Sequence, residues 1–452
     1  MTSPTSSHAL LLFETIAPPA FFDDLCQRHK LHFRSGIYSL VVIVWLMIWQ
    51  RLQARNTLAA AVQSLRQGQA GSLLSGCKRV RDGTISVRTG GFCQARQKLP
   101  KLVVMAVSDH ILTQLRSHMQ EGWPGLERPI FLIDGSSLPL PHTPELVEKF
   151  PPGGNQHGDS HWPVMKIVVF HDVFSGLALR PSWGPMYGPQ AVSEQALAQE
   201  ALERLPAEAV VMADSNFGIF AFAHAVQHSG RPMIVRLTQE RALSLERRRA
   251  GHTGTASAVE WRASEWDRKK HPQLPTGAQL TGRLLAFPHP ARPTERLYLF
   301  TTLPEPSDQV LAMYKLRWKV ETDLRSLKRT VDLHRLSGHS VDLVEKELLL
   351  AVTAYNFIRA IMCLAAQRAS LAPRQLSFSG VQALVQAIVP NLQQAATEAE
   401  VGYWLDRMVH DAAQCKLPQR RRPRSYPRVV WGQGQRFPHR KRAQPESPEP
   451  QP

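Results

Sequence analysis

The chain has 452 residues, of which 43% are hydrophobic, so it is long enough for two or three domains and apolar enough to bury a core. This composition excludes a chain that is disordered throughout. Lysine and arginine number 54 against 37 aspartates and glutamates, and the net charge of +17 favours a polyanionic partner, most simply nucleic acid. The five cysteines are scattered without a Cys-x2-Cys pair, which argues against a disulfide framework or a zinc finger and fits a reducing cytosol.

The beginning of the chain carries no targeting signal that we recognise. Residues 1–8 are polar and lack the basic and then apolar pattern of a signal peptide. The most apolar run, LVVIVWLMIW at residues 40–49, is too short for the roughly 20 residues that cross a bilayer. We therefore expect a buried helix or strand at this run, and a soluble protein.

Residues 1–125 are predicted to be helical. They contain a long stretch without proline, residues 38–99, and leucines and alanines at helical spacing. Basic residues are frequent, which favours a DNA-binding region over an ordinary solvated helical domain. They include Arg79, Arg81, Arg88, Arg96, Lys98 and Lys101.

Residues 126–240 alternate between strand-like and helical patterns. An apolar run ends at Asp134, and a second one, AVVMADSNFG, ends at Asp214. Further strands are predicted at 165–173, 177–181 and 233–237, with a hairpin turn at Ser175-Gly176, and helices at 190–205 and 221–227. Because α/β sheets place chemistry at the carboxyl ends of their strands, Asp134 and Asp214 are candidate active-site acids.

The remainder of the chain is predicted to be β-rich and then helical. Residues 241–305 are expected to form a β-rich insertion, and one helix is expected from Ser307, with Ser307-Asp308 as its cap, to about Leu336. More helices are expected between residues 341 and 415. The tail, residues 416–452, holds ten lysines or arginines, two glutamates and eight prolines, which predicts a disordered basic arm.

The sharpest local pattern lies on the predicted helix 307–336. Tyr314, Arg317, Glu321 and Lys328 are spaced by three, four and seven residues, which places them on one helix face. Arg325 shares this face, whereas Asp323 points away from it. By spacing alone, a salt-bridged surface stripe is the better interpretation.

Three acids nevertheless stand in order along the chain: Asp134, Asp214 and Glu321. Hard divalent cations such as Mg²⁺ prefer oxygen ligands. Two such ions about 4 Å apart activate the attacking oxygen and stabilise the leaving oxygen in phosphoryl transfer. The three carboxylates therefore suggest a metal-dependent enzyme that acts on phosphodiesters.

The sequence resembles the bacterial insertion-sequence DDE transposases of the type-four family. YKLRWKVETDLRSLK, residues 314–328, matches their Tyr-x2-Arg-x3-Glu-x6-Lys signature. FLIDGSSL around Asp134 and VVMADSNFG around Asp214 resemble their two aspartate motifs. The resemblance covers about residues 30–430, and Glu321 follows Asp214 by 107 positions, which leaves room for the β-strand insertion of the family.

The resemblance implies an α/β fold with a ribonuclease-H-like catalytic core. Residues 126–240 would form its first part and residues 306–340 its end, with the Glu321 helix, and residues 241–305 the insertion. Residues 1–125 would be the helical DNA-binding region, 341–415 a helical C-terminal region and 416–452 the tail.

The resemblance also implies the chemistry of the site. Asp134, Asp214 and Glu321 would bind two Mg²⁺ ions, for which Mn²⁺ substitutes, and Tyr314, Arg317 and Lys328 would contact DNA, with Arg325 as a further candidate. The enzyme would bind the terminal inverted repeats of its element, nick the ends and transfer the freed 3′-OH to target DNA. A homodimer in the synaptic complex and a place at the nucleoid in the bacterial cytoplasm follow from the same likeness. A ribonuclease-H-like nuclease without strand transfer and an inactive DNA-binding descendant are the alternatives.

Four other residues were weighed as functional. Trp261 and Trp266 in the insertion could stack on a base, but ordinary β packing is the preferred interpretation. His171 and Asp172 are interpreted as a pair at the edge of the core. No pattern for a zinc site, a P-loop or an acyl-transfer hydrolase is found in the sequence.

Overall fold

The computed structural model describes residues 16–31, 36–52, 57–67, 77–117, 128–155, 158–247, 256–289, 292–317, 323–327, 333–395 and 397–418. Glu321 and Lys328 lie outside these ranges, as does nearly all of the predicted tail. The chain divides by its contacts into residues 1–416 and residues 417–452, and the description below concerns the first of these units.

Within the described residues, nine strands form one mixed sheet in the middle of the chain, so the α/β class is confirmed. Its strands are β1 (Ile130–Pro139), β2 (Pro152–Asn155), β3 (Gly158–Asp172), β4 (Ser182–Pro185), β5 (Val210–Ala213), β6 (Met233–Leu237), β7 (Ala256–Arg262), β8 (Gln279–His289) and β9 (Arg292–Thr301). The order is β2-β3-β1-β5-β6-β9-β8-β7, and β4 pairs with β3. β1, β5 and β6 are parallel neighbours, while the other pairs are antiparallel.

The predicted insertion contributes three of these strands. β7, β8 and β9 lie within residues 241–305, and β9 hydrogen-bonds to β6. Two short helices accompany them, α11 (Gln239–Arg247) and α12 (Glu265–Lys270). The residues of the predicted insertion thus extend the sheet that carries the two aspartates.

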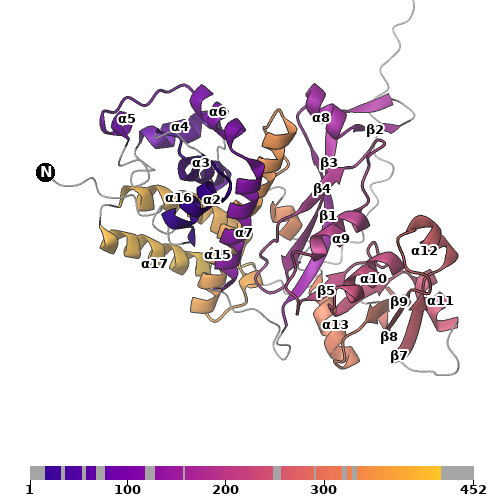
Figure 1. Ribbon diagram of the computed structural model, residues 1–452. Coiled ribbons are helices and arrows are strands. Elements are labelled where there is room, and N and C mark those ends of the chain that lie inside the picture. The colour runs from indigo at the N-terminus through magenta and orange to yellow at the C-terminus, as the bar shows by residue number, and fades with distance from the viewer. Residues whose placement is uncertain are drawn as a thin grey trace, which may run out of the picture. The chain divides into compact units, whose positions relative to one another are not determined.

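The two faces of the sheet are covered by different helices. Alternate side chains of β1, β5, β6 and β9 pack with α9 (Glu194–Leu202) and α10 (Phe220–His228) on one face. The opposite side chains of these strands pack against α13 (Ser307–Lys315). On that second face, β3 packs against α15 (Val341–Arg368) and its neighbours. Figure 1 shows α9, α10 and α13 beside the strands.

Helices from both ends of the sequence pack around α15. The N-terminal ones are α2 (Pro19–Arg28), α3 (Leu40–Leu52), α4 (Leu58–Arg66), α5 (Lys78–Arg81), α6 (Gly90–Lys98) and α7 (Lys101–Ser117). The others are α8 (Pro144–Lys149), α16 (Phe378–Gln394), α17 (Glu398–Gln414) and the 3₁₀ helix η3 (Pro373–Gln375). α15 contacts α3, α6, α7, α16 and α17, and Figure 1 shows the indigo and yellow helices intermingled.

The two most apolar helices are parts of this core. α3 contains the apolar run at residues 40–49, and nearly all of it is buried, so the prediction of a buried helix or strand is confirmed as a helix. Among the described residues, α15 alone is long and apolar enough to cross a membrane. Its apolar window is, however, 78% buried inside the protein, as in the central helix of a folded core.

Two predicted strand boundaries are wrong. β1 does not end at Asp134 but continues to Pro139, because β3 pairs with it as far as Val164. The run 177–181 forms only a single bridge, between Ala178 and His171, with hydrogen bonds that join Leu177 and Leu179 to the end of β3. The outward-facing N–H and carbonyl of Ala178 bond to the side chain of Asn356. The strand that returns along β3 is β4 instead.

The prediction of one helix from Ser307 to about Leu336 is also wrong. α13 starts after an N-cap at Pro306 that makes no side-chain hydrogen bond, and it ends at Lys315. Residues 323–325 are helical and 326–327 form a π turn, whereas 333–339 are not helical. The side chain of Glu347 accepts hydrogen bonds from the backbone N–H groups of Ser337 and Gly338, which holds this stretch in an irregular conformation.

Candidate active site

Asp134 and Asp214 lie side by side on neighbouring strands. β1 and β5 are parallel, and Ile130, Phe131 and Leu132 pair with Val210, Val211 and Met212. Continuing this register by two residues puts Asp134 beside Asp214, on strands about 4.8 Å apart. Because side chains alternate between faces, both aspartates share the face of Leu132 and Met212, which α13 covers.

Each aspartate is held by a local hydrogen bond. The N–H of Gly135 donates to Oδ1 of Asp134 (2.8 Å), and the N–H of Asn216 donates to Oδ1 of Asp214 (2.9 Å). The second bond closes a turn directly after β5, which fixes the direction of the Asp214 carboxylate. Both residues are half-buried, so their carboxylates are neither sealed in the core nor fully solvated.

A third carboxylate, which the sequence did not single out, approaches from the other face of the sheet. A Cβ atom on Gly135 would lie 2.7 Å from the carboxyl carbon of Glu194, so the glycine leaves the space that this side chain occupies. Glu194 also accepts a hydrogen bond from Nδ2 of Asn216 (3.4 Å). Glu194 therefore touches the residue after Asp134 and the turn after Asp214.

Arg236 extends the row of the two aspartates by one strand. Ala213 of β5 pairs with Val235 of β6, so Asp214 and Arg236 are the next positions in register. A charged residue inside the otherwise apolar run MIVRL was the available signal in the sequence. Across three parallel strands the same face thus presents an acid, an acid and a guanidinium.

The residues that α13 presents to this row include Tyr314. Its side chain is fully buried among the apolar residues beneath the helix. Burial raises the pKa of Tyr314 to about 12; the positive charges of Arg317 and Arg236 act against this rise and the negative charge of Asp214 adds to it. The guanidinium of Arg317 lies 6.0 Å from the centre of the Tyr314 ring. The side chain of Tyr314 therefore lies between α13, which begins the signature, and the Asp214 end of the row.

The other residues of the signature are placed only in part. Arg325 is exposed, and Asp323 is completely buried. Glu321 and Lys328 lie outside the described residues. Within the ranges described above, no group of three or more His, Cys, Asp or Glu side chains is arranged to hold a metal ion.

The four other candidates divide between the core and the surface. Trp261 is buried and makes edge-to-face contacts with Phe220 and Phe300, so the preference for ordinary packing is confirmed. For Trp266 the preference for β packing is wrong, because this residue lies on the helix α12 and is 56% exposed. The ammonium of Lys270 lies 4.7 Å from the centre of its ring. His171 and Asp172 are both buried, in agreement with their interpretation as core residues.

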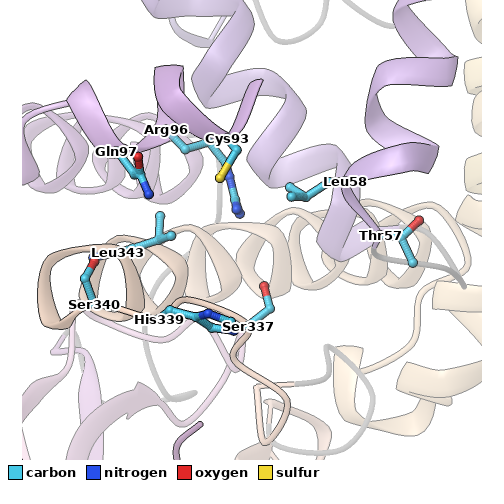
Figure 2. A pocket seen from close by; sticks show the side chains of 9 residues that line it. All are labelled: Thr57, Leu58, Cys93, Arg96, Gln97, Ser337, His339, Ser340 and Leu343. Atoms are coloured by element: carbon cyan, nitrogen blue, oxygen red, sulfur yellow. The ribbon is translucent and has the colours of Figure 1, made fainter. Parts of the chain in front are cut away.

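A pocket lies elsewhere, where α4 and α6 meet the start of α15. Figure 2 shows Cys93, Arg96 and Gln97 facing Ser337 and His339 across it. Its volume is about 510 Å³. Of the residues that the structure describes, neither Asp134 nor Asp214 lines this pocket.

Comparison with known proteins identifies the family. A model of the transposase DDE domain matches residues 125–357, which is over half of the chain. The chain belongs to the DDE transposases. It is also 26% identical over 416 residues to a curated protein, the transposase InsG for insertion sequence element IS4 of Escherichia coli strain K12, with 90% of this chain and 88% of that relative covered.

The transposase is thus an enzyme that cleaves DNA and transfers strands, as the sequence predicted. The matched residues contain Asp134, Asp214 and the whole signature at residues 314–328. Enzymes of this family generally use divalent metal ions and act on DNA. The surplus of 17 positive charges fits a DNA substrate.

Proposed function

We propose that the transposase binds the terminal inverted repeats of an insertion sequence and moves it by cut-and-paste transposition, with Asp134, Asp214 and Glu321 as its metal-binding triad. The observation that carries this proposal is the parallel register that sets Asp134 beside Asp214. The helix that begins the Glu321 signature, α13, covers the face on which both aspartates lie. Glu321 would complete the set from that side.

A ribonuclease-H-like core is the fold that we propose for this site. Antiparallel β3 and β1 followed by parallel β5 and β6, with helices on both faces, support it. In this proposal residues 126–240 and 306–340 form the core and 241–305 the insertion. Residues 1–125 and 341–415 are the helical regions on either side in sequence, and 416–452 are the basic tail.

The donor groups of the proposed triad fit Mg²⁺. Carboxylate oxygens are the ligands that this hard cation prefers, and two half-buried aspartates at matched strand positions supply them. Two bound ions would activate the attacking oxygen and stabilise the leaving oxygen, and Mn²⁺ would substitute. Arg236 at the end of the row would offset part of the negative charge that the carboxylates bring together.

Contacts to DNA are proposed for the basic residues of the signature. Arg317, Arg325 and Lys328 would position the phosphate backbone near the cleaved end. For Tyr314, complete burial favours a role beneath Arg317 over a direct contact with DNA. We further propose that two copies act together in the synaptic complex, and that they act at the nucleoid in the cytoplasm.

The test is Glu321→Ala in a coupled assay with a terminal-repeat duplex, a pre-cleaved 3′-OH end and target DNA. Loss of a metal ligand removes several kcal/mol of stabilisation from the transition state, so we expect cleavage and joining to fall about 10²–10³-fold. Binding to the terminal repeat, measured by gel shift, should remain. Glu398→Ala, an exposed acid in the first turn of α17, is the matched control. Cleavage at the wild-type rate in Glu321→Ala would refute the triad.

A further inference from the structure

Asp323, two residues after Glu321 in the sequence, lies in a buried ionic cluster. Its side chain is 0% exposed. One carboxylate oxygen pairs with Nη2 of Arg359 on α15, and the other lies 2.7 Å from Nη1 of Arg374 on η3. One carboxylate is therefore held from two sides by planar guanidinium groups, which fix its direction as well as its position.

Both arginines are in turn fixed to the sheet. Arg374 donates from Nε to the carbonyl of Val173, directly after β3 (2.5 Å). Arg359 donates from Nε to the hydroxyl of Tyr355 (2.8 Å), which donates to the carbonyl of Gly176 (2.9 Å). Gly176 has a φ of +76°, and a Cβ atom there would lie 2.8 Å from the Arg359 guanidinium. The turn after β3 and the two arginines are thus built against one another.

This connection reaches the strand that carries Asp134. β3 is the antiparallel neighbour of β1, with Asp172 opposite Phe131 and Val169 opposite Asp134. The turn held by the arginines begins at the Asp172 end of that pairing. A contiguous set of hydrogen bonds and ion pairs therefore runs from the residue two places after Glu321 to the strand of Asp134.

The cluster holds further buried groups beside the two ion pairs. Asp172 accepts hydrogen bonds from the N–H and hydroxyl of Ser175, and Arg374 donates to the backbone carbonyl of Asp172. His171 beside them is kept neutral, because burial lowers its pKa to about 4. Since buried ion pairs contribute little to net stability, the distinctive property of the cluster is its geometry.

We propose that Asp323 is a positioning residue, which sets the place of Glu321 relative to Asp134 and Asp214 through Arg359 and Arg374. This inference rests on the triad proposed above. Partners that orient a metal ligand without touching the metal change metal affinity or activity by roughly 10–100-fold when they are lost. Asp323 would do so for Glu321, the last of the three acids in the chain.

The test compares Asp323→Asn with the wild type in the full chain bound to a terminal-repeat duplex. Metal binding is measured directly, from the free Mn²⁺ signal in electron paramagnetic resonance, alongside cleavage, gel shift and thermal melting. We expect Mn²⁺ affinity and cleavage to fall about 10-fold or more, cleavage to recover partly at high Mn²⁺, and DNA binding to stay within about twofold. Asp406→Asn is the control. It breaks the exposed pair between Asp406 on α17 and Arg368 on α15, the helix that also carries Arg359, and should change neither Mn²⁺ affinity nor cleavage.

Each outcome decides the matter. Mn²⁺ affinity within about twofold of wild type in Asp323→Asn would overturn the proposal, whatever happens to the melting temperature. If Asp323→Asn does not fold, Arg374→Lys is measured in the same way, since it keeps the charge but loses the fork of the guanidinium. The variant Glu321→Gln distinguishes a failure of the positioning role from a failure of the proposed triad. If that variant retains full Mn²⁺ affinity, the triad is wrong; if only Glu321→Gln loses affinity, the positioning role alone is wrong.

Discussion

Asp134 and Asp214 on the sheet are half-buried, and each accepts a hydrogen bond from a nearby backbone N–H. Asp323 and Glu347, in the helical segments that pack against the sheet, are fully buried, and each faces two arginines. A carboxylate enclosed by guanidinium groups has a structural role, because a metal cation would have to displace those groups in order to bind it. The exposure and partners of an acid thus distinguish the two aspartates that we propose as metal ligands from the acids that hold the fold.

The largest effect is expected from Glu347, whose carboxylate is the most heavily engaged of these four acids. It pairs with Arg51 of α3 (3.2 Å) and Arg96 of α6 (3.0 Å) and accepts three hydrogen bonds from Ser337 and Gly338. Glu347→Ala would leave two buried arginines without this partner, which costs about 3–5 kcal/mol of the free energy of unfolding. Chemical denaturation measures the loss, and DNA binding and cleavage should fall together.

The control for this variant is Asp24→Ala, since Asp24 forms an exposed pair with Arg28 one helical turn away. Such pairs contribute about 0.2–1 kcal/mol. If Glu347→Ala were no less stable than Asp24→Ala, the distinction between enclosed and accessible acids would lose its energetic basis.

The second prediction concerns pH and the cluster around Asp323. Burial lowers the pKa of His171 to about 4, with the positive charges of Arg359 and Arg374 acting in the same direction and Asp323 opposing them. The unfolded chain binds this proton below about pH 6.5, whereas the folded chain resists it. The contribution of neutral His171 to the free energy of unfolding is therefore fully present above about pH 6.5 and is lost as the pH falls towards 4.

The lost stability amounts to roughly 3 kcal/mol over this range, at about 1.4 kcal/mol per pH unit. His171→Leu removes the titrating group, so its free energy of unfolding should depend less steeply on pH between about 6.5 and 4.5. His410→Leu, at an exposed position on α17, should keep the wild-type slope. Equal slopes in all three proteins would show that folding does not lower the pKa of His171.

Much of the fold follows from local patterns that the sequence displays. Residues 233–237 form the strand predicted for them, and 341–368 form the predicted helix, because a continuous apolar run and a proline-free helical pattern are local signals. The order of Asp134, Asp214 and Glu321 was enough to indicate the kind of site. The family match then confirmed the transposase.

The features that could not be predicted from the sequence depend on contacts between distant segments. The continuation of β1 past Asp134 is decided by β3, and the places of Glu194 and Arg236 beside the aspartates are decided by tertiary packing and strand register. Asp323 was expected to point away from the face of the signature, and its carboxylate is buried against α15 and η3. Its two arginine partners, 36 and 51 residues further along the chain, carry no local signal in the sequence.

The smallest effect is expected from Arg236, which lies in the half-buried row of Asp134 and Asp214. Its place beside Asp214 in register predicts that it offsets carboxylate charge in the row. Arg236→Ala should therefore slow single-turnover cleavage about tenfold, or ~1.4 kcal/mol in the barrier, while Arg236→Lys retains most of the rate. Arg407→Ala, which removes an exposed arginine of α17, is the control.

The salt dependence of DNA binding shows what Arg236 acts on. A residue that grips a phosphate contributes about one unit to the slope of log K against log[salt], so losing it lowers the slope by that amount. Since Arg236 is half-buried and aligned with Asp214, we expect the slope of Arg236→Ala to equal that of the wild type. A reduced slope would assign Arg236 to the DNA backbone, and an unchanged cleavage rate would remove it from the site.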